Sequence, residues 1–421
     1  MSGVAPFAAY RASSTPLLPD PPAHWSDEPV WTMFSRTARK GYPDETLLSV
    51  YRDHGVVPKA SRDDNFNRAS EDLSAYQLVE PGDLAVNKMK AWQGSLSISR
   101  LRGIVSPAYF VYAAHHRHED RYLHHLLRAT PLVAAYRTLS TGVRIGQWDL
   151  DPQAFSRMKL PMPPRDEQRA IADYLDCETA QIDTLIAKQE ELIARLRERQ
   201  YSTWARSYQR TLESAPTVAL RRLVSSIVDG PFGSSLTSSH YSDTGARVIR
   251  LGNIGINEFR TDDITYIPLD YFAQLKAHEA LPGDVVVAGL GDERMPLGRA
   301  AVVPDLGPAI VKADCYRLRP DTSTLSTYLA WVLSAPQTRE QFALLARGST
   351  RSRLNTSVVL EAKVPVPTLA QQREIVLTSD QQQSKIDALI GKAERFIALA
   401  KERRAALITA AVTGQLDVTA A

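Results

Sequence analysis

Residues 159–203 read KLPMPPRDEQRAIADYLDCETAQIDTLIAKQEELIARLRERQYST, and residues 363–407 read KVPVPTLAQQREIVLTSDQQQSKIDALIGKAERFIALAKERRAAL. The second stretch repeats the first at a displacement of 204 residues without a gap, and 17 of the 45 positions are identical. Average residue usage would give roughly three identities. An internal duplication therefore organises this chain, and a duplication has to be recognised before secondary structure is interpreted.

Each copy predicts a strand followed by a long helix, because prolines at its start give way to about 40 residues without one. Helices over roughly 169–204 and 373–412 would be about 54 and 60 Å long at 1.5 Å per residue. Apolar residues recur every three or four positions, while the other faces are charged, so each helix is expected to pack its apolar seam against the other as a coiled coil. The predicted seam comprises Ile182, Leu185, Ile186, Leu192, Ile193 and Leu196 in the first helix and Ile386, Leu389, Ile390, Phe396, Ile397 and Leu407 in the second.

The segments ahead of the two helices are each long enough to form a domain. Strand-like and helix-like runs alternate in them, and the turn at Pro81 to Leu84 is echoed at Pro282 to Val285. The predicted fold class is therefore α+β, with two mixed domains that are each followed by a long helix, and with the two helices paired as a coiled coil. The predicted boundaries are 1–164 and 214–366 for the domains and 165–213 and 367–416 for the helical spacers. Residues 5–22, which include five prolines, are expected to form an extended arm outside both cores.

Composition places the chain among folded proteins and excludes several classes. Of the 421 residues, 44% are hydrophobic and 23% are charged, and 50 basic against 47 acidic side chains leave a net charge of +3. No apolar stretch reaches the length of a membrane helix, and no secretory leader is recognisable, so we expect a cytoplasmic protein. Cys177 and Cys315 are interpreted as reduced thiols. With so small a net charge, any DNA binding must rely on locally arranged basic residues.

Three motifs resemble catalytic or metal sites but are incomplete. Asp20-Pro21-Pro22 is followed by an alanine where an amino-methyltransferase needs an aromatic residue to stack on the target base. The glycine pattern that begins at Gly289 has Arg294 where a dinucleotide site needs its third glycine. Five histidines between 115 and 125 have no nearby cysteine to complete a ligand set. We therefore expect no catalytic residue, no cofactor and no metal, and favour solvated or phosphate-facing roles for the histidines.

Basic residues interleaved with aromatic and amide residues indicate DNA contacts. Arginine can donate two hydrogen bonds to guanine, and asparagine or glutamine can pair in the same way with adenine. Such residues follow the Pro-Gly-Asp turn in both halves and also precede both long helices. The candidates are Lys88, Lys90, Trp92, Arg144 and Gln147 in the first half and Arg250, Asn253, Arg294, Arg299, Arg347, Arg351 and Arg353 in the second.

With these residues assembled, the chain resembles the specificity subunit of Type I restriction-modification systems over nearly its whole length. The resemblance is carried by residues 82–112, 227–233, 248–255 and 283–301, and above all by the helix openings at 160–171 and 364–375. It implies two target-recognition domains that each read one half of an asymmetric gapped DNA sequence. It also implies that the coiled-coil helices form an antiparallel pair in a pseudo-twofold repeat. This pair would separate the two domains and dock two methyltransferase subunits, with Gln168, Arg169, Gln372 and Arg373 as docking candidates. Restriction and motor subunits would join through the methyltransferases, and catalysis would lie in the partners.

Two other classes of function remain open on the sequence. A single-chain restriction or methyltransferase enzyme would methylate or cut DNA by itself. A coiled-coil scaffold would bind protein partners and read no DNA. The incomplete catalytic motifs argue against the enzyme, and the paired basic loops argue against the scaffold.

Overall fold

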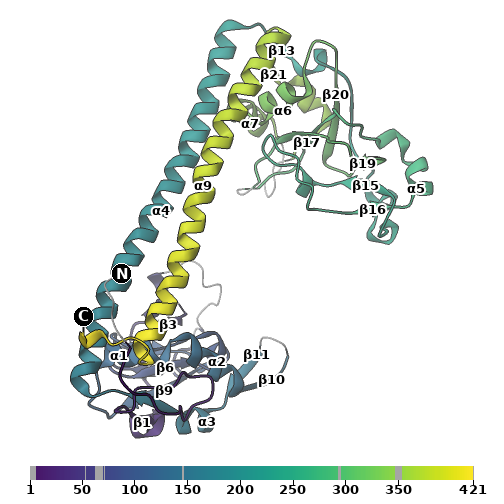
Figure 1. Cartoon of the computed structure of the whole chain (residues 1–421). Coiled ribbons are helices and arrows are strands. Elements are labelled where there is room, and N and C mark those ends of the chain that lie inside the picture. Colours follow the sequence, from purple (N-terminus) through teal and green to yellow (C-terminus); the bar gives the residue numbers. More distant parts are fainter. Residues whose placement is uncertain are drawn as a thin grey trace. The chain divides into compact units, whose positions relative to one another are not determined.

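The computed structural model describes residues 6–52, 54–61, 70, 72–144, 147–292, 295–346 and 353–420. The chain divides into two compact units, each of which contains part of both long helices (Figure 1). Unit 1 comprises residues 1–189 and 394–421, and unit 2 comprises residues 190–393. None of the helices in the described residues is both long and apolar enough to span a membrane.

Unit 1 is built around a four-stranded antiparallel sheet in the order β2-β9-β6-β7. Helices α1 and α2 and the short helix α3 pack against it, and the core includes Leu84, Tyr112 and Phe155. The sheet strands are β2 (Phe34–Thr37), β6 (Leu84–Asn87), β7 (Leu96–Ile98) and β9 (Tyr109–Ala114), and the helices are α1 (Asp120–Leu127), α2 (Thr130–Thr138) and α3 (Pro152–Arg157). Four two-stranded pairs complete the unit, namely β1 (Ser26–Pro29) with β12 (Lys159–Met162), β3 (Leu48–Tyr51) with β4 (Gly55–Pro58), β5 (Gln77–Val79) with β8 (Gly103–Val105) and β10 (Ser140–Arg144) with β11 (Gln147–Leu150).

Unit 2 repeats this plan with its own four-stranded antiparallel sheet, in the order β14-β20-β17-β18. The helix α6 contributes the fully buried Trp331 to its core. The elements of this sheet and its cover are β14 (Val224–Val228), β17 (Val285–Ala288), β18 (Ala300–Val302), β20 (Cys315–Pro320), α6 (Ser326–Ser334), α7 (Pro336–Leu345) and α8 (Thr356–Glu361). The others are β13 (Thr217–Ala219) paired with β21 (Lys363–Pro365), the sheet β16 (Tyr266–Ile267)-β15 (Ala246–Ile249)-β19 (Ala309–Val311), and α5 (Leu269–Gln274).

The duplication extends from the sequence to individual hydrogen bonds. The hydroxyl of Tyr122 on α1 donates to the carbonyl of Pro161 at 2.9 Å, and the hydroxyl of Tyr328 on α6 donates to the carbonyl of Pro365 at 2.8 Å. Pro161 and Pro365 are equivalent positions of the sequence repeat. Although the domain sequences have diverged, the hydrogen bond that joins α1 or α6 to the strand ahead of each long helix has therefore been kept.

The long helices α4 (Arg165–Ser214) and α9 (Leu369–Val412) pack together and run antiparallel. In unit 1, the start of α4 lies against the end of α9, and Arg404 forms an ion pair with Asp183 at 2.9 Å. In unit 2, the amide of Gln200 donates to Asp387 at 3.4 Å, which is the repeat-related contact. The predicted α+β fold with a pair of long helices is confirmed.

Both helices are longer than the spacing of apolar residues predicted. Helix α4 begins directly after Pro164 and ends two residues before Pro216, so prolines bound it on both sides. The helix can continue to Ser214 because Pro216 disfavours the α conformation only for Ala215, the residue directly before it. Helix α9 starts four residues before the predicted position, behind a Thr368 and Gln371 capping box.

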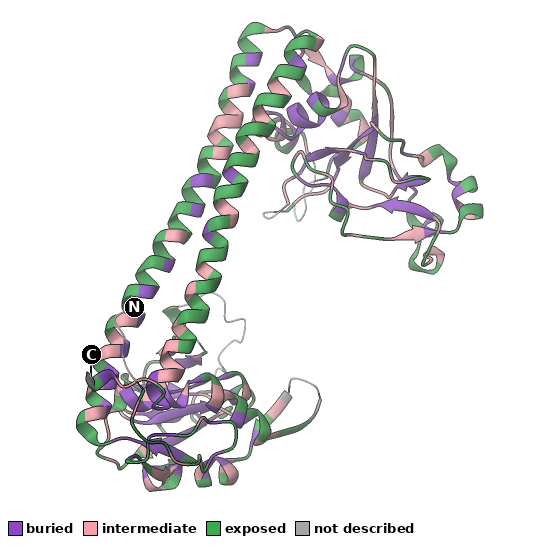
Figure 2. Cartoon of the chain, in the orientation of Figure 1, coloured by how far each residue is buried: buried purple, intermediate pink, exposed green. Residues whose placement is uncertain are grey.

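The predicted seam residues divide into three groups according to exposure (Figure 2). Ile182, Ile186, Ile193, Leu196 and Ile386 are buried, and Ile390, Ile397 and Leu407 are half-buried. Four others are more than 40% exposed: Leu185, Leu192, Leu389 and Phe396. The last group gives the helices an apolar surface that their mutual packing leaves uncovered.

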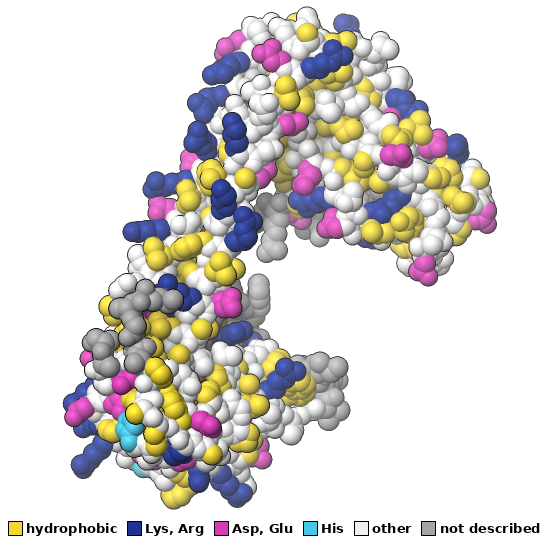
Figure 3. Space-filling view, in the orientation of Figure 1, with side chains coloured by type: hydrophobic (Ala, Val, Ile, Leu, Met, Phe, Trp, Pro, Cys, Tyr) yellow, Lys and Arg dark blue, Asp and Glu magenta, His cyan; other side chains and the backbone are white. Residues whose placement is uncertain are grey.

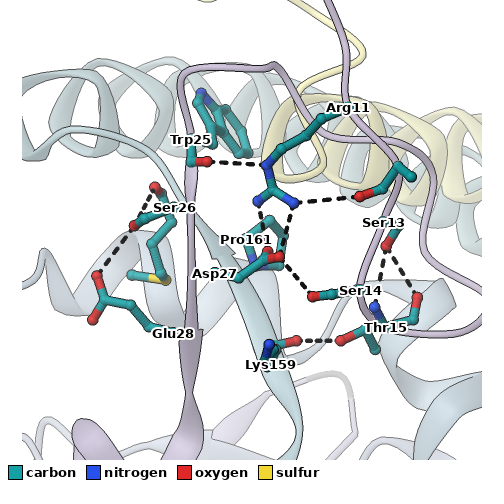
Figure 4. A network of polar contacts seen from close by, with 12 residues as sticks. Arg11, Ser13, Ser14, Thr15, Trp25, Ser26, Asp27, Glu28, Lys159 and Pro161 are labelled. Atoms are coloured by element: carbon teal, nitrogen blue, oxygen red, sulfur yellow. Dashed lines mark hydrogen bonds and ion pairs between the residues drawn. The ribbon is translucent and has the colours of Figure 1, made fainter.

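The proline-rich N-terminal segment packs against unit 1, contrary to the expectation of an arm outside the cores. The guanidinium of Arg11 forms a two-pronged ion pair with Asp27 on β1, at 2.8 and 2.6 Å, and Ser14 also donates to this carboxylate (Figure 4). Leu18 belongs to the core cluster. Beyond α9, the amide of Gln415 donates to the carbonyl of Asp20, so the segments near the two ends meet in unit 1. No local pattern could have indicated these partners, because they lie far apart along the chain.

Candidate nucleic-acid interface

The Pro-Gly-Asp turns position the first group of candidate residues. Gly82 and Gly283 have φ values of +92° and +88°, a conformation that glycine adopts without strain. The carboxylates of Asp83 and Asp284 accept hydrogen bonds from backbone amides of their own turns, at 2.9 and 2.8 Å. Burial raises the pKa of Asp83, although the adjacent Arg39 opposes this shift. Each turn therefore starts a buried strand at a fixed place, and β6 and β17 lead away from it towards the candidate residues.

Lys88, Lys90 and Trp92 lie just beyond the end of β6. The ammonium of Lys88 donates to the carbonyl of Pro107 at 2.5 Å and lies 4.8 Å from the centre of the Phe110 ring. Lys90 is exposed, and Trp92 is half-buried against Trp148, with 5.1 Å between the ring centres. The structure thus brings these three candidates together on one side of unit 1.

Arg144 and Gln147 are opposite each other in the β10–β11 pair. The structure describes their backbones and not their side chains. The pairing places an arginine and a glutamine next to one another at the outer end of a two-stranded ribbon, which hydrogen-bonds to no further strand among the described residues.

In unit 2, the side chains of Arg250 and Asn253 form hydrogen bonds with other residues of the same unit. The Arg250 guanidinium pairs with the carboxylate of Asp263, whose hydrogen bond raises the pKa of the arginine. Asn253 is completely buried, and its amide donates to the carbonyls of Arg260 and Asp263 at 2.8 and 2.9 Å. Its oxygen accepts from the Arg250 amide at 2.9 Å. Asn253 therefore shapes the turn after β15 and has no amide atom left for a base.

Arg299 is buried inside unit 2, with 3% of its surface exposed. Its guanidinium donates to five backbone carbonyls, those of Leu251, Ile254, Leu290, Met295 and Pro296, at 2.6 to 3.2 Å. Burial lowers its pKa. Arg299 thus joins the loop after β15 to the loop between β17 and β18, and we interpret it as a structural residue rather than a DNA contact.

Replacing Arg299 with alanine is expected to destabilise unit 2 by about 3 kcal/mol, because carbonyls that accept from a charged donor would be left buried without a partner. Hydrogen exchange of the β17 and β18 amides in the full chain would measure the change. Arg221→Ala, at an exposed arginine of the same unit, is the matched control and should change stability by less than about 0.5 kcal/mol. Equal exchange rates in both variants would show that the five contacts do not stabilise the unit.

Arg353 is half exposed, pairs with Asp314 at 2.7 Å and lies 5.5 Å from the centre of the Phe232 ring. It is the described member of the basic group that precedes α9. Three other candidates, Arg294, Arg347 and Arg351, lie outside the residues that the structure describes.

Gln168 and Gln372, two of the docking candidates, make matching contacts inside their units. The Gln168 oxygen accepts from the amide of Glu119 at 2.9 Å, and its nitrogen donates to the carbonyl of Pro163 at 2.8 Å. The Gln372 oxygen accepts from the amide of Leu325 at 2.9 Å, and its nitrogen donates to Pro367 at 3.0 Å. Both glutamines are at most 1% exposed, so each joins a long helix to the start of α1 or α6. Arg169 and Arg373 beside them are exposed.

Gln168→Ala and Gln372→Ala are each expected to lower stability by about 2 kcal/mol, since a buried amide and a buried carbonyl would be left without a partner. Chemical denaturation and hydrogen exchange at the start of α1 and α6 would measure this. The neighbouring variants Arg169→Ala and Arg373→Ala should leave stability within about 0.5 kcal/mol of the parent. If the glutamine variants were as stable as the arginine variants, the positioning role would be refuted.

The two helix openings make different contacts at the repeat-related positions Glu167 and Gln371. Glu167 accepts hydrogen bonds from the Trp25 indole at 2.8 Å and from His24 at 2.9 Å, so it binds the N-terminal segment to α4. Gln371 instead accepts from the Thr368 amide at 3.0 Å and caps its own helix. The surfaces around the two openings are therefore unequal.

Two of the five clustered histidines contact carboxylates, and His124 instead contacts Ser97 at 3.1 Å and Arg128 at 2.7 Å. His118 contacts Glu28 at 3.0 Å, and His125 contacts Asp176 at 3.1 Å. Burial lowers the pKa of His116 to about 4, which keeps its ring neutral at physiological pH. Across the described part of the chain, no group of three or more histidines, cysteines or acidic residues is arranged to hold a metal ion.

Four residues of this interface were not predicted from the sequence, namely Arg36, Phe110, Arg137 and Trp148. Arg36 lies 4.4 Å from the centre of the Phe110 ring, and Arg137 lies 5.5 Å from the centre of the Trp148 ring. Trp148 directly follows the candidate Gln147. The alternation of apolar Trp148 and Leu150 with polar Gln147 and Asp149 indicates a strand, and this pattern was the only sign of Trp148 in the sequence. Arg36 on β2 contacts the Phe110 ring of β9, and Arg137 on α2 contacts the Trp148 ring of β11, so both contacts depend on the folded chain.

Comparison with known proteins places these features in context. No protein-family model matches the chain. The MjaVIII Type I restriction enzyme specificity subunit of Methanocaldococcus jannaschii is 22% identical over 275 residues, which is 61% of each chain. The StySPI specificity subunit of Salmonella potsdam is 24% identical over 178 residues, 42% of this chain and 38% of the relative. The matched stretch thus spans less than two thirds of either relative.

A solved structure described as the structural basis of complex assembly and conformational transition of the type I R-M system has the same fold. It aligns with a TM-score of 0.65 and 17% identity over 94% of this chain and 99% of the other. The curated homologues of this chain are thus specificity subunits of Type I restriction enzymes, and the resemblance carried by its repeated helix openings is confirmed.

Proposed function

We propose that this chain is the DNA-reading specificity subunit of a Type I restriction-modification complex. The observation that carries the proposal is the duplicated junction, in a chain whose homologues are specificity subunits. At each junction, equivalent glutamines join the start of α1 or α6 to a long helix, and equivalent tyrosines join the same short helix to the strand ahead of that long helix. Each assembly would read one half of a gapped DNA target. The predicted boundaries, 1–164 and 214–366 for the recognition domains and 165–213 and 367–416 for the spacers, form part of this proposal.

The target is expected to be asymmetric, because the two domains share a topology but not their exposed side chains. Two domains that contact major-groove faces one helical turn apart would be separated by about 34 Å along the duplex. The base pairs between these contacts would remain unread. Among the described side chains, the candidate DNA contacts that are exposed or half-buried are Lys88, Lys90, Trp92, Arg250 and Arg353, of which the two arginines are paired with aspartates of their own unit.

Two methyltransferase subunits would dock on the helical spacers, near Arg169 and Arg373 and the exposed apolar residues. A duplicated chain can offer similar surfaces to two identical partners. Because Glu167 and Gln371 make different contacts, we expect the two docking surfaces to differ in affinity. Methyl transfer, DNA cleavage and translocation would reside in the partner subunits, within the cytoplasm.

Footprinting of the full chain, with and without methyltransferase subunits, tests the proposal directly. In the footprint, we expect two short protected segments separated by unprotected base pairs. In the host genome, we expect methylated adenines within both of these target segments. Methylation or cleavage by the chain alone would favour the single-chain enzyme. Partner binding without a protected gapped sequence would favour the scaffold.

A further inference from the structure

The β10–β11 ribbon stands apart from the sheets of unit 1. Its strands pair only with each other among the described residues, from Ser140 opposite Leu150 to Arg144 opposite Gln147. The ribbon projects from the body of the unit (Figure 1). A two-stranded ribbon is one of the two elements that fit the major groove of B-DNA, which is about 12 Å wide.

The base of the ribbon is fixed tightly to the unit. Leu150 is buried in the core, its amide donates to the carbonyl of Lys88 at 3.1 Å, and the Ser140 hydroxyl donates to the carbonyl of Tyr136 at 2.7 Å. The Trp148 ring rests against Trp92. These contacts hold the ribbon at a set angle, which a reading element requires because base contacts tolerate little displacement.

Cations surround this base. Arg36 and Lys88 lie on the Phe110 ring, and Arg137 lies on the Trp148 ring. Arg36 and Arg137 are exposed, as is Lys90 nearby. Figure 3 shows basic and apolar side chains next to one another on this part of unit 1. Their aromatic contacts steady the side chains while the charges remain accessible to phosphates.

The ribbon itself carries a different chemistry from its base. Asp149 is exposed and pairs in register with Thr141. A carboxylate is repelled by phosphates but can accept a hydrogen bond from the amino group of cytosine. Arg144 and Gln147, opposite each other at the outer end, are the residue types that bind guanine and adenine. A ribbon that carries a carboxylate, an arginine and an amide between basic flanks matches a groove floor between two phosphate backbones.

We propose that the β10–β11 ribbon is the element with which unit 1 reads its half-site from the major groove. In this arrangement Trp92 and Trp148 act as positioning residues, and Arg36, Lys88 and Arg137 bind the flanking phosphates. The inference rests on the proposed function and deepens it, because it assigns base recognition and backbone binding to separate side chains.

Trp148→Ala in the full chain, alone and with methyltransferase subunits, tests the positioning role. We define discrimination as the ratio of the affinity for DNA with the correct first half-site to the affinity for DNA with a substituted first half-site. In Trp148→Ala, this ratio should fall about tenfold or more. Discrimination at the second half-site should not change. Trp148→Phe should restore most of the discrimination. Trp31→Ala, at an exposed tryptophan of the same unit, is the matched control and should have no effect.

The phosphate contacts have a separate signature. Arg36→Gln with Arg137→Gln should weaken binding to correct and substituted first half-sites equally. The double variant should also reduce the slope of log affinity against log salt concentration by about 0.9 for each phosphate that is no longer neutralised. Arg100→Gln is the control, because Arg100 is exposed and follows β7 at the opposite end of the same sheet from Lys88. If Trp148→Ala unfolds unit 1, Arg144→Ala decides instead and should relax discrimination at one base pair.

The outcomes are distinguishable from failure of the proposed function itself. If the parent chain protects no gapped sequence, the proposed function fails. If the parent reads both half-sites while the ribbon variants retain first half-site discrimination, only the present inference is overturned. Weakened methyltransferase binding with unchanged DNA discrimination would also overturn it, since the ribbon would then be a protein-docking element.

Discussion

A longer gap between two unchanged half-sites is expected when both long helices are extended by the same seven residues. The insertion points are the repeat-related positions between Gln189 and Glu190 in α4 and between Ala393 and Glu394 in α9, where the two units meet along the chain. Seven residues add about 10 Å of helix and keep the seam within about 20° of its original face. At about 3.4 Å per base pair, the preferred gap should grow by about three base pairs.

These insertion points lie away from the cores of the recognition domains. Further along α4, Trp204 packs against Trp331, and Tyr208 is buried in the core of unit 2, so an insertion there would disturb a recognition domain. Binding to a series of targets that differ only in gap length would measure the effect. Insertion into α4 alone is the control. It shifts one helix against the other and should weaken binding to every target. Altered half-sites in the doubly extended chain would contradict a separation between spacing and reading.

Dimerisation is expected when the chain is truncated after residue 213. Such a fragment lacks residues 394–421, which complete unit 1 in the full chain and contribute Ala411 and Val412 to its core. We expect two copies to complete each other, with residues 190–213 of each taking the place of 394–417 in the other. The resulting dimer should bind an inverted repeat of the first half-site. Light scattering and footprinting would measure both properties.

Side chains at the exchanged positions make this dimer imperfect. Trp204 and Tyr208 would occupy the places of Ile408 and Val412, and larger side chains in a filled core cost about 1–3 kcal/mol. Adding Trp204→Ile and Tyr208→Val to the fragment should therefore tighten the dimer about tenfold. Residues 1–189 joined to 394–421 by a flexible linker provide the control, which should remain monomeric. A monomeric fragment that binds no DNA would contradict the quasi-symmetry.

Prediction from the sequence succeeded where the signal was periodic or repeated. The 204-residue displacement identified both long helices, because a coiled-coil seam has to recur along each helix to stay against its partner. The same repeat marked Gln168 and Gln372 as important without showing how. Their role became visible only in the structure, where each amide holds the first turn of a neighbouring helix.

The candidate DNA contacts show where residue type stops being informative. Arginine, lysine and asparagine suit base or phosphate contacts, but Arg299 and Asn253 use the same donors to fix loops of their own unit. Sequence alone cannot separate the two uses, because burial depends on segments that are distant in the chain. The reverse holds for Arg36 and Arg137, which gain a role from the rings beside them.

The sequence by itself therefore determined the duplicated architecture, the α+β class and the pairing of two long helices, since these follow from local periodicity and from the likeness of two segments of one chain. Tertiary structure decided which polar side chains are engaged inside the units, how the N-terminal segment packs, and which cations gather at the β10–β11 ribbon. The physical reason is that hydrogen-bond satisfaction and burial are set by contacts between residues far apart in sequence, for which one sequence carries no periodic signal.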